Sequence, residues 1–263
     1  MKKYALYLLA SALLAAAGCS KTATEEGSDG CGRLALQAAA DNRIATRAQV
    51  ETGPAPSADE FALRITGDDY DRTWENLAAF NRSDELLVKG SYTVRIVWGD
   101  PEAEGADKPY YTGEETIEIK ARQLNRATVT ARVANSQTAV RATEAFLAYF
   151  HDAEFTLTTE SGNSFRFTPG AETADPAVWV KAGTRLTLNG TAMLQSQTGT
   201  AFDRPYTFPE QVLEATAPRT RHTFLFDARE AGSVTLKINL TEDFVEERLI
   251  PVELNDGAIP DNE

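Results

Sequence analysis

The sequence predicts an all-β protein made of two tandem antiparallel β-sandwich domains. Apolar and polar residues alternate with a period of two in many short segments, which is the pattern of strands that are buried on one face. Helical periodicity is confined to two short stretches, and Gly- and Pro-rich segments separate the strands. Several sequence features recur in the same order in the second half, as tandem copies would require.

The alternating segments recur along the chain after residue 60. In the first of them, Phe61, Leu63 and Ile65 fall on one face. The other segments are 92–98, 116–119, 127–133, 155–157, 165–167, 186–188, 223–225 and 234–240. Strands of this length and spacing are typical of β-sandwiches. Residues 143–150, which follow a potential N-cap at Thr143, and residues 74–80 favour helices, but both stretches are too short to organise a core.

Four pieces of sequence echo one another in order, and they suggest where the domains begin and end. The matched pieces are 61–63 with 155–157, 90–91 with 183–184, 126–129 with 221–224, and 143–146 with 241–244. We therefore expect a first domain at 32–135 and a second at 136–255. The strand at 233–240 would be an additional one, and the acidic residues 256–263 would form a disordered tail.

The N-terminus predicts export. Lys2 and Lys3 precede an apolar run over residues 4–17, which is shorter than the roughly 20 residues of a membrane-spanning helix. The small residues that lead to Cys19 resemble a bacterial lipobox, although Ala16 stands where that motif usually has Leu. The resemblance implies a lipoprotein signal peptide at 1–18 and an acyl anchor, of the palmitate kind, on Cys19. The alternative is an ordinary signal peptide that ends near a cysteine.

Residues 19–31 read as a flexible polar tether that starts at the lipidated cysteine. Its acidic stretch resembles the surface-export signal of Bacteroidota-type lipoproteins, which implies an outer-membrane protein displayed at the cell surface. With Cys19 acylated, Cys31 has no partner for an internal disulfide. The formal net charge of −13, which loss of Lys2 and Lys3 would make −15, excludes nucleic acid as a natural partner.

The residue inventory predicts a protein that is not an enzyme and uses neither a cofactor nor a metal. His151 and His222 are the only histidines, and both are expected at exposed or rim positions. Nucleophile, P-loop, zinc and Cys-pair motifs do not occur. The acidic cluster 68–71 lacks the spacing of an EF-hand loop, and a solvated turn is the favoured interpretation.

Aromatic residues at one Gly/Pro loop are the candidate contacts for a ligand or a partner. Trp98, Tyr110 and Tyr111 flank the loop 99–109. Aromatic faces with a polar edge suit stacking on sugars or packing against a protein. The alternative is that Trp98 and one of the tyrosines simply end core strands.

A set of short motifs resembles a known family. The motifs are Gly-Arg-Leu-Ala-Leu at 32–36, Thr-Arg-Ala at 46–48, Gly-Ser-Tyr-Thr-Val at 90–94, Gly-Asp at 99–100 and Pro-Tyr-Tyr-x-Gly at 109–113. Together they resemble an uncharacterised family of Bacteroidota-type surface lipoproteins, a domain of unknown function that is distantly similar to fimbrillins.

The fimbrillin resemblance implies a role in adhesion or fimbria-like surface assembly. It makes Arg47, or Arg43, a candidate site of proteolytic processing, and the C-terminal strand a candidate donor to the next subunit. Pro260 and the acidic character of the C-terminal tail do not match the pattern of a donor strand. The expected partners are the membrane, through the lipid on Cys19, and surface proteins or glycans. The alternative function is a glycan-binding surface lipoprotein of a polysaccharide uptake system.

Overall fold

The computed structural model describes residues 30–44, 50–51, 54–170, 177–196, 203–229, 233–239 and 245–250. These residues form eighteen strands, two short α-helices and one 3-10 turn, which confirms the all-β prediction. In this described part, no helix has the length and apolar character needed to cross a membrane. The signal peptide, Cys19, the tether, Arg47 and the tail at 256–263 lie outside the described residues, so the expectations for them stay predictions.

The N-terminal half of the body contains β1 to β9. Its elements are β1 (Cys31–Asp41), β2 (Arg43–Ile44), β3 (Val50–Glu51), η2 (Ala58–Glu60), β4 (Ala62–Gly67), β5 (Tyr70–Trp74), α1 (Leu77–Arg82), β6 (Leu86–Val88), β7 (Gly90–Trp98), β8 (Tyr111–Ile119) and β9 (Leu124–Val133). Seven strands pair in the order β5-β4-β7-β8-β9-β1-β6. The sheet folds over at β8 and β9, because inward side chains of β4 and β7 share one core with those of β1 and β9.

The C-terminal half contains β10 to β18 and has two separate sheets. Its elements are β10 (Ser136–Ala142), α2 (Glu144–Leu147), β11 (Phe150–Thr159), β12 (Ser164–Phe167), β13 (Val178–Val180), β14 (Leu186–Leu194), β15 (Arg204–Leu213), β16 (Arg221–Arg229), β17 (Ser233–Asn239) and β18 (Val245–Ile250). The strand orders are β12-β11-β14-β15 and β13-β10-β16-β17-β18. Between them lies an aromatic core in which Phe155 stacks on Phe226 at 4.2 Å and contacts Phe208.

The two halves share one topology. In each half, the first strand pairs in parallel with a late strand and antiparallel with a short one: β1 with β9 and β6, and β10 with β16 and β13. The four-stranded layers β5-β4-β7-β8 and β12-β11-β14-β15 also correspond. This order supports tandem copies. The expected boundary between 135 and 136 stays a prediction, with β9 ending at Val133 and β10 beginning at Ser136 on either side of it.

Both expected helices exist but are shorter than, or shifted from, the predicted segments. Thr143 caps α2 by accepting a hydrogen bond from Phe146 N, yet the helix ends at Leu147 because Phe150 begins β11. The expected helix at 74–80 begins late, since Trp74 ends β5 and the side chain of Asn76 caps α1.

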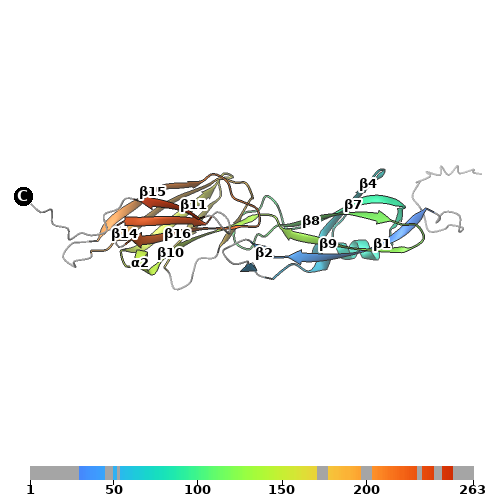
Figure 1. The fold of residues 1–263 in the computed structure, drawn as a ribbon, viewed down its shortest axis with the longest axis horizontal. Helices are drawn as coiled ribbons and strands as arrows, with labels where there is room; N and C mark the ends of the chain where they lie inside the picture. The colour runs from blue at the N-terminus through green and yellow to red at the C-terminus, as the bar shows by residue number, and fades with distance from the viewer. Residues whose placement is uncertain are drawn as a thin grey trace, which may run out of the picture.

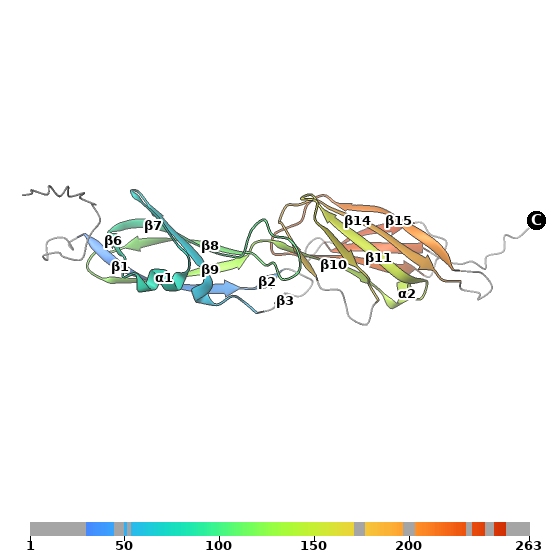
Figure 2. The same ribbon diagram turned by 180° about the vertical axis from the view of Figure 1, so that it is seen from behind.

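The halves lie end to end in Figure 1 and Figure 2, and three groups of contacts join them. Trp179 of β13 is 3% exposed and belongs to the core of the N-terminal half. Its backbone exchanges two hydrogen bonds of 2.8 and 2.9 Å with Gly105. The carboxylate of Glu104 accepts hydrogen bonds from Thr159 Oγ1 at 2.7 Å, from Asn163 and from the backbone of residue 181.

The third group of contacts is ionic. Arg219 of the C-terminal half donates to Asp41 Oδ2 at 3.1 Å and to the backbone carbonyl of Arg43. Hydrogen bonding from Arg43, together with the charge of Arg219, lowers the pKa of Asp41 to about 2. The two halves are thus in contact through the buried side chain and backbone bridge of Trp179, the hydrogen bonds of Glu104 and this ion pair.

Candidate functional site

A seam between β8 and β9 is open over most of its length. The two strands pair only at Tyr111–Val133 and Thr112–Arg132. The next residue, Gly113, lies where β8 crosses β9: a Cβ atom there would stand 2.3 Å from the carbonyl oxygen of Thr130. Only glycine, which has no side chain, allows the two backbones to approach this closely. Beyond Gly113, the two strands separate into the two layers.

The separation leaves an open groove of about 560 Å³ between the strand edges. Ile117, which is 8% exposed, and the half-buried Ala127 supply its apolar surface. Three consecutive residues of β8, 114–116, are exposed, which breaks the alternation of the strand. Acidic side chains come from β8, and basic ones from β9 and the turn before it. The lining residues are Glu115, Thr116, Ile117, Glu118, Lys120, Gln123, Asn125, Arg126, Ala127 and Thr128.

The corresponding edge of the C-terminal half is covered. There β16 takes the place of β9, and β17 pairs with it along six residue pairs, with β18 beyond. Among the described strands of the N-terminal half, nothing takes the place of β17, and the β8–β9 ladder ends at Thr112 and Arg132. An edge strand without a neighbour offers its backbone N–H and C=O groups to an incoming strand. The groove is therefore a candidate site for strand addition.

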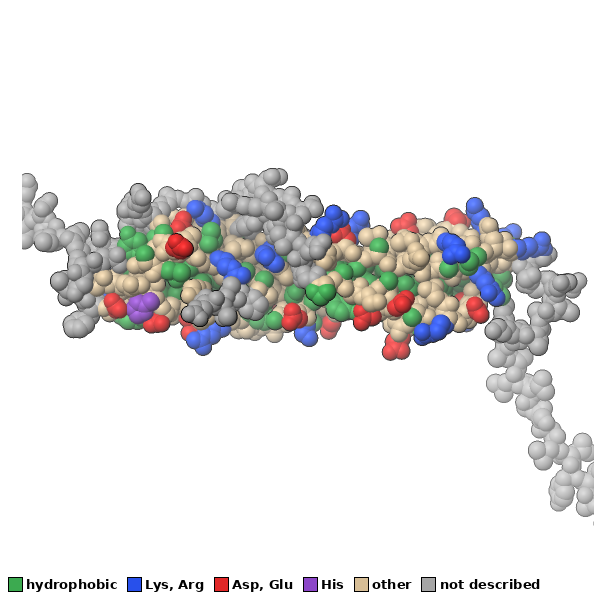
Figure 3. All heavy atoms as spheres, turned by 90° about the horizontal axis from the view of Figure 1, so that it is seen from below, with side chains coloured by type: hydrophobic (Ala, Val, Ile, Leu, Met, Phe, Trp, Pro, Cys, Tyr) green, Lys and Arg blue, Asp and Glu red, His purple; other side chains and the backbone are tan. Residues whose placement is uncertain are grey.

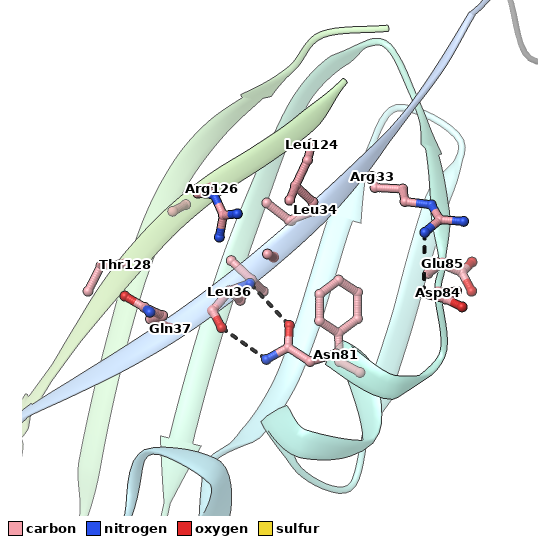
Figure 4. A pocket seen from close by; sticks show the side chains of 13 residues that line it. Arg33, Leu34, Leu36, Gln37, Asn81, Asp84, Glu85, Leu124, Arg126 and Thr128 are labelled. Atoms are coloured by element: carbon pink, nitrogen blue, oxygen red, sulfur yellow. Dashed lines mark hydrogen bonds and ion pairs between the residues drawn. The ribbon is translucent and has the colours of Figure 1, made fainter. Parts of the chain in front are cut away.

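The opposite edge of the same layer is closed by a side chain. The pairing of β6 with β1 stops at Leu86 and Arg33. Beyond it, the Asn81 side-chain amide accepts a hydrogen bond from Leu36 N at 3.1 Å and donates one to Leu36 O at 2.9 Å, as Figure 4 shows. The amide thus takes the hydrogen bonds that a neighbouring strand would make. A hollow of about 390 Å³ remains next to it, with Arg33, Leu124 and Arg126 in its lining.

The aromatic residues expected to form a contact site are mainly structural. Trp98 and Tyr111 face each other across β7 and β8, with ring centroids 6.0 Å apart, and Tyr111 is 1% exposed. Tyr111 is therefore a core residue at the start of β8, in agreement with the alternative interpretation that Trp98 and one of the tyrosines end core strands. Trp98 is partly buried against the same core, and Tyr110 is partly exposed with its backbone N–H bonded to Asn135.

The two histidines occupy different environments. His151 has a side chain 38% exposed and lies within 2.7–2.8 Å of carboxylate oxygens of Asp152 and Asp203, and bonding to Asp203 and then to Asp152 raises the pKa of His151. His222 is 1% exposed and its Nε2 accepts a hydrogen bond from Ala217 N, so the expectation of an exposed position is wrong for it. Neither histidine is placed beside a nucleophile by these contacts.

The acidic turn at 68–71 has a structural partner. Asp71 pairs with Arg64 on the adjacent strand at 2.6 Å, and this contact lowers the pKa of Asp71. Across the described residues, no group of three or more His, Cys, Asp or Glu side chains is arranged to hold a metal.

Comparison with solved structures finds Bacteroides proteins of similar length. A suggested polysaccharide-binding protein (DUF1812) from Bacteroides thetaiotaomicron has a TM-score of 0.42 and 10% identity, covering 82% of this chain and 98% of that one. A suggested cell adhesion protein from Bacteroides ovatus has a TM-score of 0.35 and 10% identity, covering 84% and 97%. One from Bacteroides eggerthii has a TM-score of 0.38 and 8% identity, covering 86% and 96%. At these TM-scores, the similarities assign no function.

No curated protein matches this chain. A family model described as a domain of unknown function, DUF4493, matches residues 30–256, which include every described residue. The match begins one residue before β1 and extends beyond β18. The chain therefore belongs to the DUF4493 family.

Proposed function

We propose that this protein is a lipid-anchored, non-enzymatic cell-surface protein that acts in adhesion or fimbria-like assembly by accepting an extended segment of a partner subunit between β8 and β9. The observation that carries the proposal is the contrast between the two halves. The same strand edge is paired with β17 in the C-terminal half, whereas in the N-terminal half none of the described strands pairs with it beyond Thr112 and Arg132. Lipidation of Cys19 and display at the surface belong to the proposal and rest on the sequence.

Strand addition fits the chemistry of the groove. An incoming strand would gain main-chain hydrogen bonds, each worth about 0.5–1.5 kcal/mol net. Alternate side chains of that strand would face Ile117 and Ala127, which favours small or apolar residues at every second position. Glu115 and Glu118 line one side and Arg126 the other, so a segment with separated charges would be matched in one orientation better than in the reverse.

The glycan-binding alternative keeps only part of its expected platform. A sugar-stacking surface requires exposed aromatic faces, and Tyr111 is buried, Trp98 is partly buried against the core, and Tyr110 is partly exposed. The residues that line the groove include no aromatic side chain. Recognition of a polypeptide segment accounts for both facts.

The proposal is tested with cells that display the native protein or a variant blocked in the groove. Ala127→Glu places a carboxylate among the apolar groove residues, whereas Thr130→Glu alters an exposed position on the same strand outside the groove and serves as the matched control. Surface display is checked by protease shaving of intact cells, with Cys19→Ala as the unanchored control. Thermal unfolding confirms that both β9 variants fold.

We expect cell–cell or cell–matrix adhesion to fall with Ala127→Glu and to stay unchanged with Thr130→Glu. Equal adhesion by the two folded variants would contradict the groove as the binding site. Protection of the body from protease until lysis would instead contradict surface display, while leaving the groove to be tested in the periplasm.

A further inference from the structure

One face of the N-terminal half carries all three exposed large hydrophobic side chains of the described residues. Leu86 is 49% exposed, Val88 59% and Leu124 49%. They lie on the outer face of the layer formed by β6, β1 and β9. Leu86 and Leu124 flank Arg33 in register, and Val88 pairs with Cys31. The alternation of burial along β1 and β6 confirms that these positions point away from the core.

Basic side chains surround this apolar group. The exposed cations on this face and on the turns at the same end are Arg33, Lys89, Lys120, Arg122 and Arg126. Two acids lie beside this group: Asp84 pairs with Arg33, one of these cations, at 3.6 Å, and Glu85 pairs with Arg72, which lies outside the group, at 2.9 Å. Glu118 lies in the groove beside Lys120. A local excess of cations is unusual in a chain whose formal net charge is −13, and Figure 3 shows Lys and Arg side chains gathered at this end.

The apolar group and the cations form what we call the base patch: Leu86, Val88 and Leu124 with the five cations named above. The patch lies where the chain enters the body. Lys89 N donates to Gly30 O at 2.6 Å, and Arg122 N donates to Cys31 O at 2.8 Å, so both basic turns are fixed to the first residues of β1. In Figure 1, β1 begins at the end of the N-terminal half that is farther from the C-terminal half.

We propose that the base patch rests on the anionic headgroup layer of the membrane that holds the acylated Cys19, an inference that rests on the lipid anchor of the proposed function. Eleven peptide steps separate Cys19 from Gly30, and a fully extended chain of that length reaches at most about 40 Å. The anchor therefore keeps the patch close to the lipid surface. Cations attract anionic headgroups, and the apolar side chains enter the boundary between headgroups and acyl chains.

A second copy of the chain is a poorer occupant for the patch. Two base patches facing each other would bring like charges together around only three apolar side chains on each side, and repulsion would oppose the contact. The acidic remainder of the body would in turn be repelled by the same membrane, so contact through the patch would hold the long axis away from the lipid surface.

The test uses the protein without its first 19 residues, which keeps every described residue and both cores. Binding is measured by co-sedimentation with vesicles of equal parts phosphatidylglycerol and phosphatidylcholine, and with vesicles of phosphatidylcholine alone. The variants are Lys89→Gln with Arg122→Gln, and Leu86→Ser with Val88→Ser. Arg185→Gln with Arg204→Gln removes two exposed cations from the C-terminal half as the matched control.

We expect the native body to bind the anionic vesicles, more weakly as salt rises, and to ignore the neutral ones. Each cation removed from the patch should reduce the partition coefficient about fivefold, and the serine variant should also reduce it, while the control pair leaves it unchanged. Equal binding to both vesicles, or equal loss with the control pair, would overturn the proposal. So would a dimer, seen by sedimentation, that the patch variants abolish. Mass spectrometry of Cys19 in the full chain tests the anchor separately, so failure of the anchor and failure of the patch are distinguishable.

Discussion

Replacing Trp179 by alanine should destabilise the N-terminal half, although Trp179 belongs in sequence to the C-terminal half. Trp179 lies on β13 of the C-terminal half but is 3% exposed within the core of the N-terminal half. Truncation of a buried tryptophan removes its packing and leaves a cavity, which costs about 3–5 kcal/mol. Because a domain is stable by only about 5–15 kcal/mol, the change would be a large part of the total for that half.

The assay is hydrogen exchange with mass spectrometry across a denaturant series, which reports the stability of each half from its own peptides. Peptides of β7, β8 and β9 should lose protection at lower denaturant in the Trp179→Ala protein. Peptides of β11 and β14 should change much less. Phe226→Ala, which truncates the other core, is the matched variant and should give the reverse pattern.

The reasoning would be refuted by a loss of protection confined to the C-terminal half. An effect below about 1 kcal/mol in β7 to β9 would refute it as well, because that is the size of an ordinary surface substitution or less. An equal loss in both halves would show that the junction couples them into one cooperative unit.

Three further predictions concern the crossing strands, a histidine and the early arginine. Gly113→Ala should lower the free energy of unfolding, measured by chemical denaturation, by about 1–3 kcal/mol, because the added Cβ would overlap the backbone of β9. Gly30→Ala should leave it unchanged, because a Cβ at position 30 has no atom within 4 Å. Asp203→Asn should lower the raised pKa of His151 toward 6.5, which NMR titration would measure, and an unchanged pKa would count against the hydrogen bond. Any folding stability that comes from the raised pKa is present below pH about 6.5 and is lost as the pH rises through the folded-state pKa. Cleavage after Arg47 should leave β1 bound to the body through its ladders, so that size-exclusion chromatography in native buffer shows one species and a denaturing gel two fragments; separation in native buffer would contradict this.

The strand pattern was readable from the sequence where strands are buried on one face only, whereas β10 and β13, which have runs of consecutive buried residues, show no alternation. Phe61, Leu63 and Ile65, whose alternation predicts a strand, are all 1% exposed or less. Three of the repeated pairs, 61–63 with 155–157, 90–91 with 183–184 and 126–129 with 221–224, fall at corresponding strands of the two halves. The fourth pair does not relate the halves, because 143–146 lies in the C-terminal half and 241–244 lies outside the described residues. The helix at 74–80 was misplaced because Trp74 packs on Phe80 from the end of β5, a tertiary contact that local propensity does not contain.

The candidate site was not predicted, because it depends on how two strands pair. Tyr111 was a candidate contact because it flanks a Gly- and Pro-containing loop, but its register opposite Trp98 places it in the core, as the alternative interpretation allowed. The groove lies instead beyond Gly113, where the sequence Glu114-Glu115-Thr116 interrupts the alternation. That interruption is the signal that could have revealed an unpaired edge, yet only the structure shows that β17 covers the equivalent edge and that no described strand takes its place beside β9.

The most direct test of strand addition is site-specific photo-cross-linking on living cells. A photoreactive amino acid replaces Ala127 in the groove or, as the control, Thr130 on the same strand, and mass spectrometry identifies what is attached. The account predicts a polypeptide adduct at position 127, mapping to one extended segment of a surface protein, and none at position 130. Adducts at both positions alike, or a glycan adduct at 127, would contradict it.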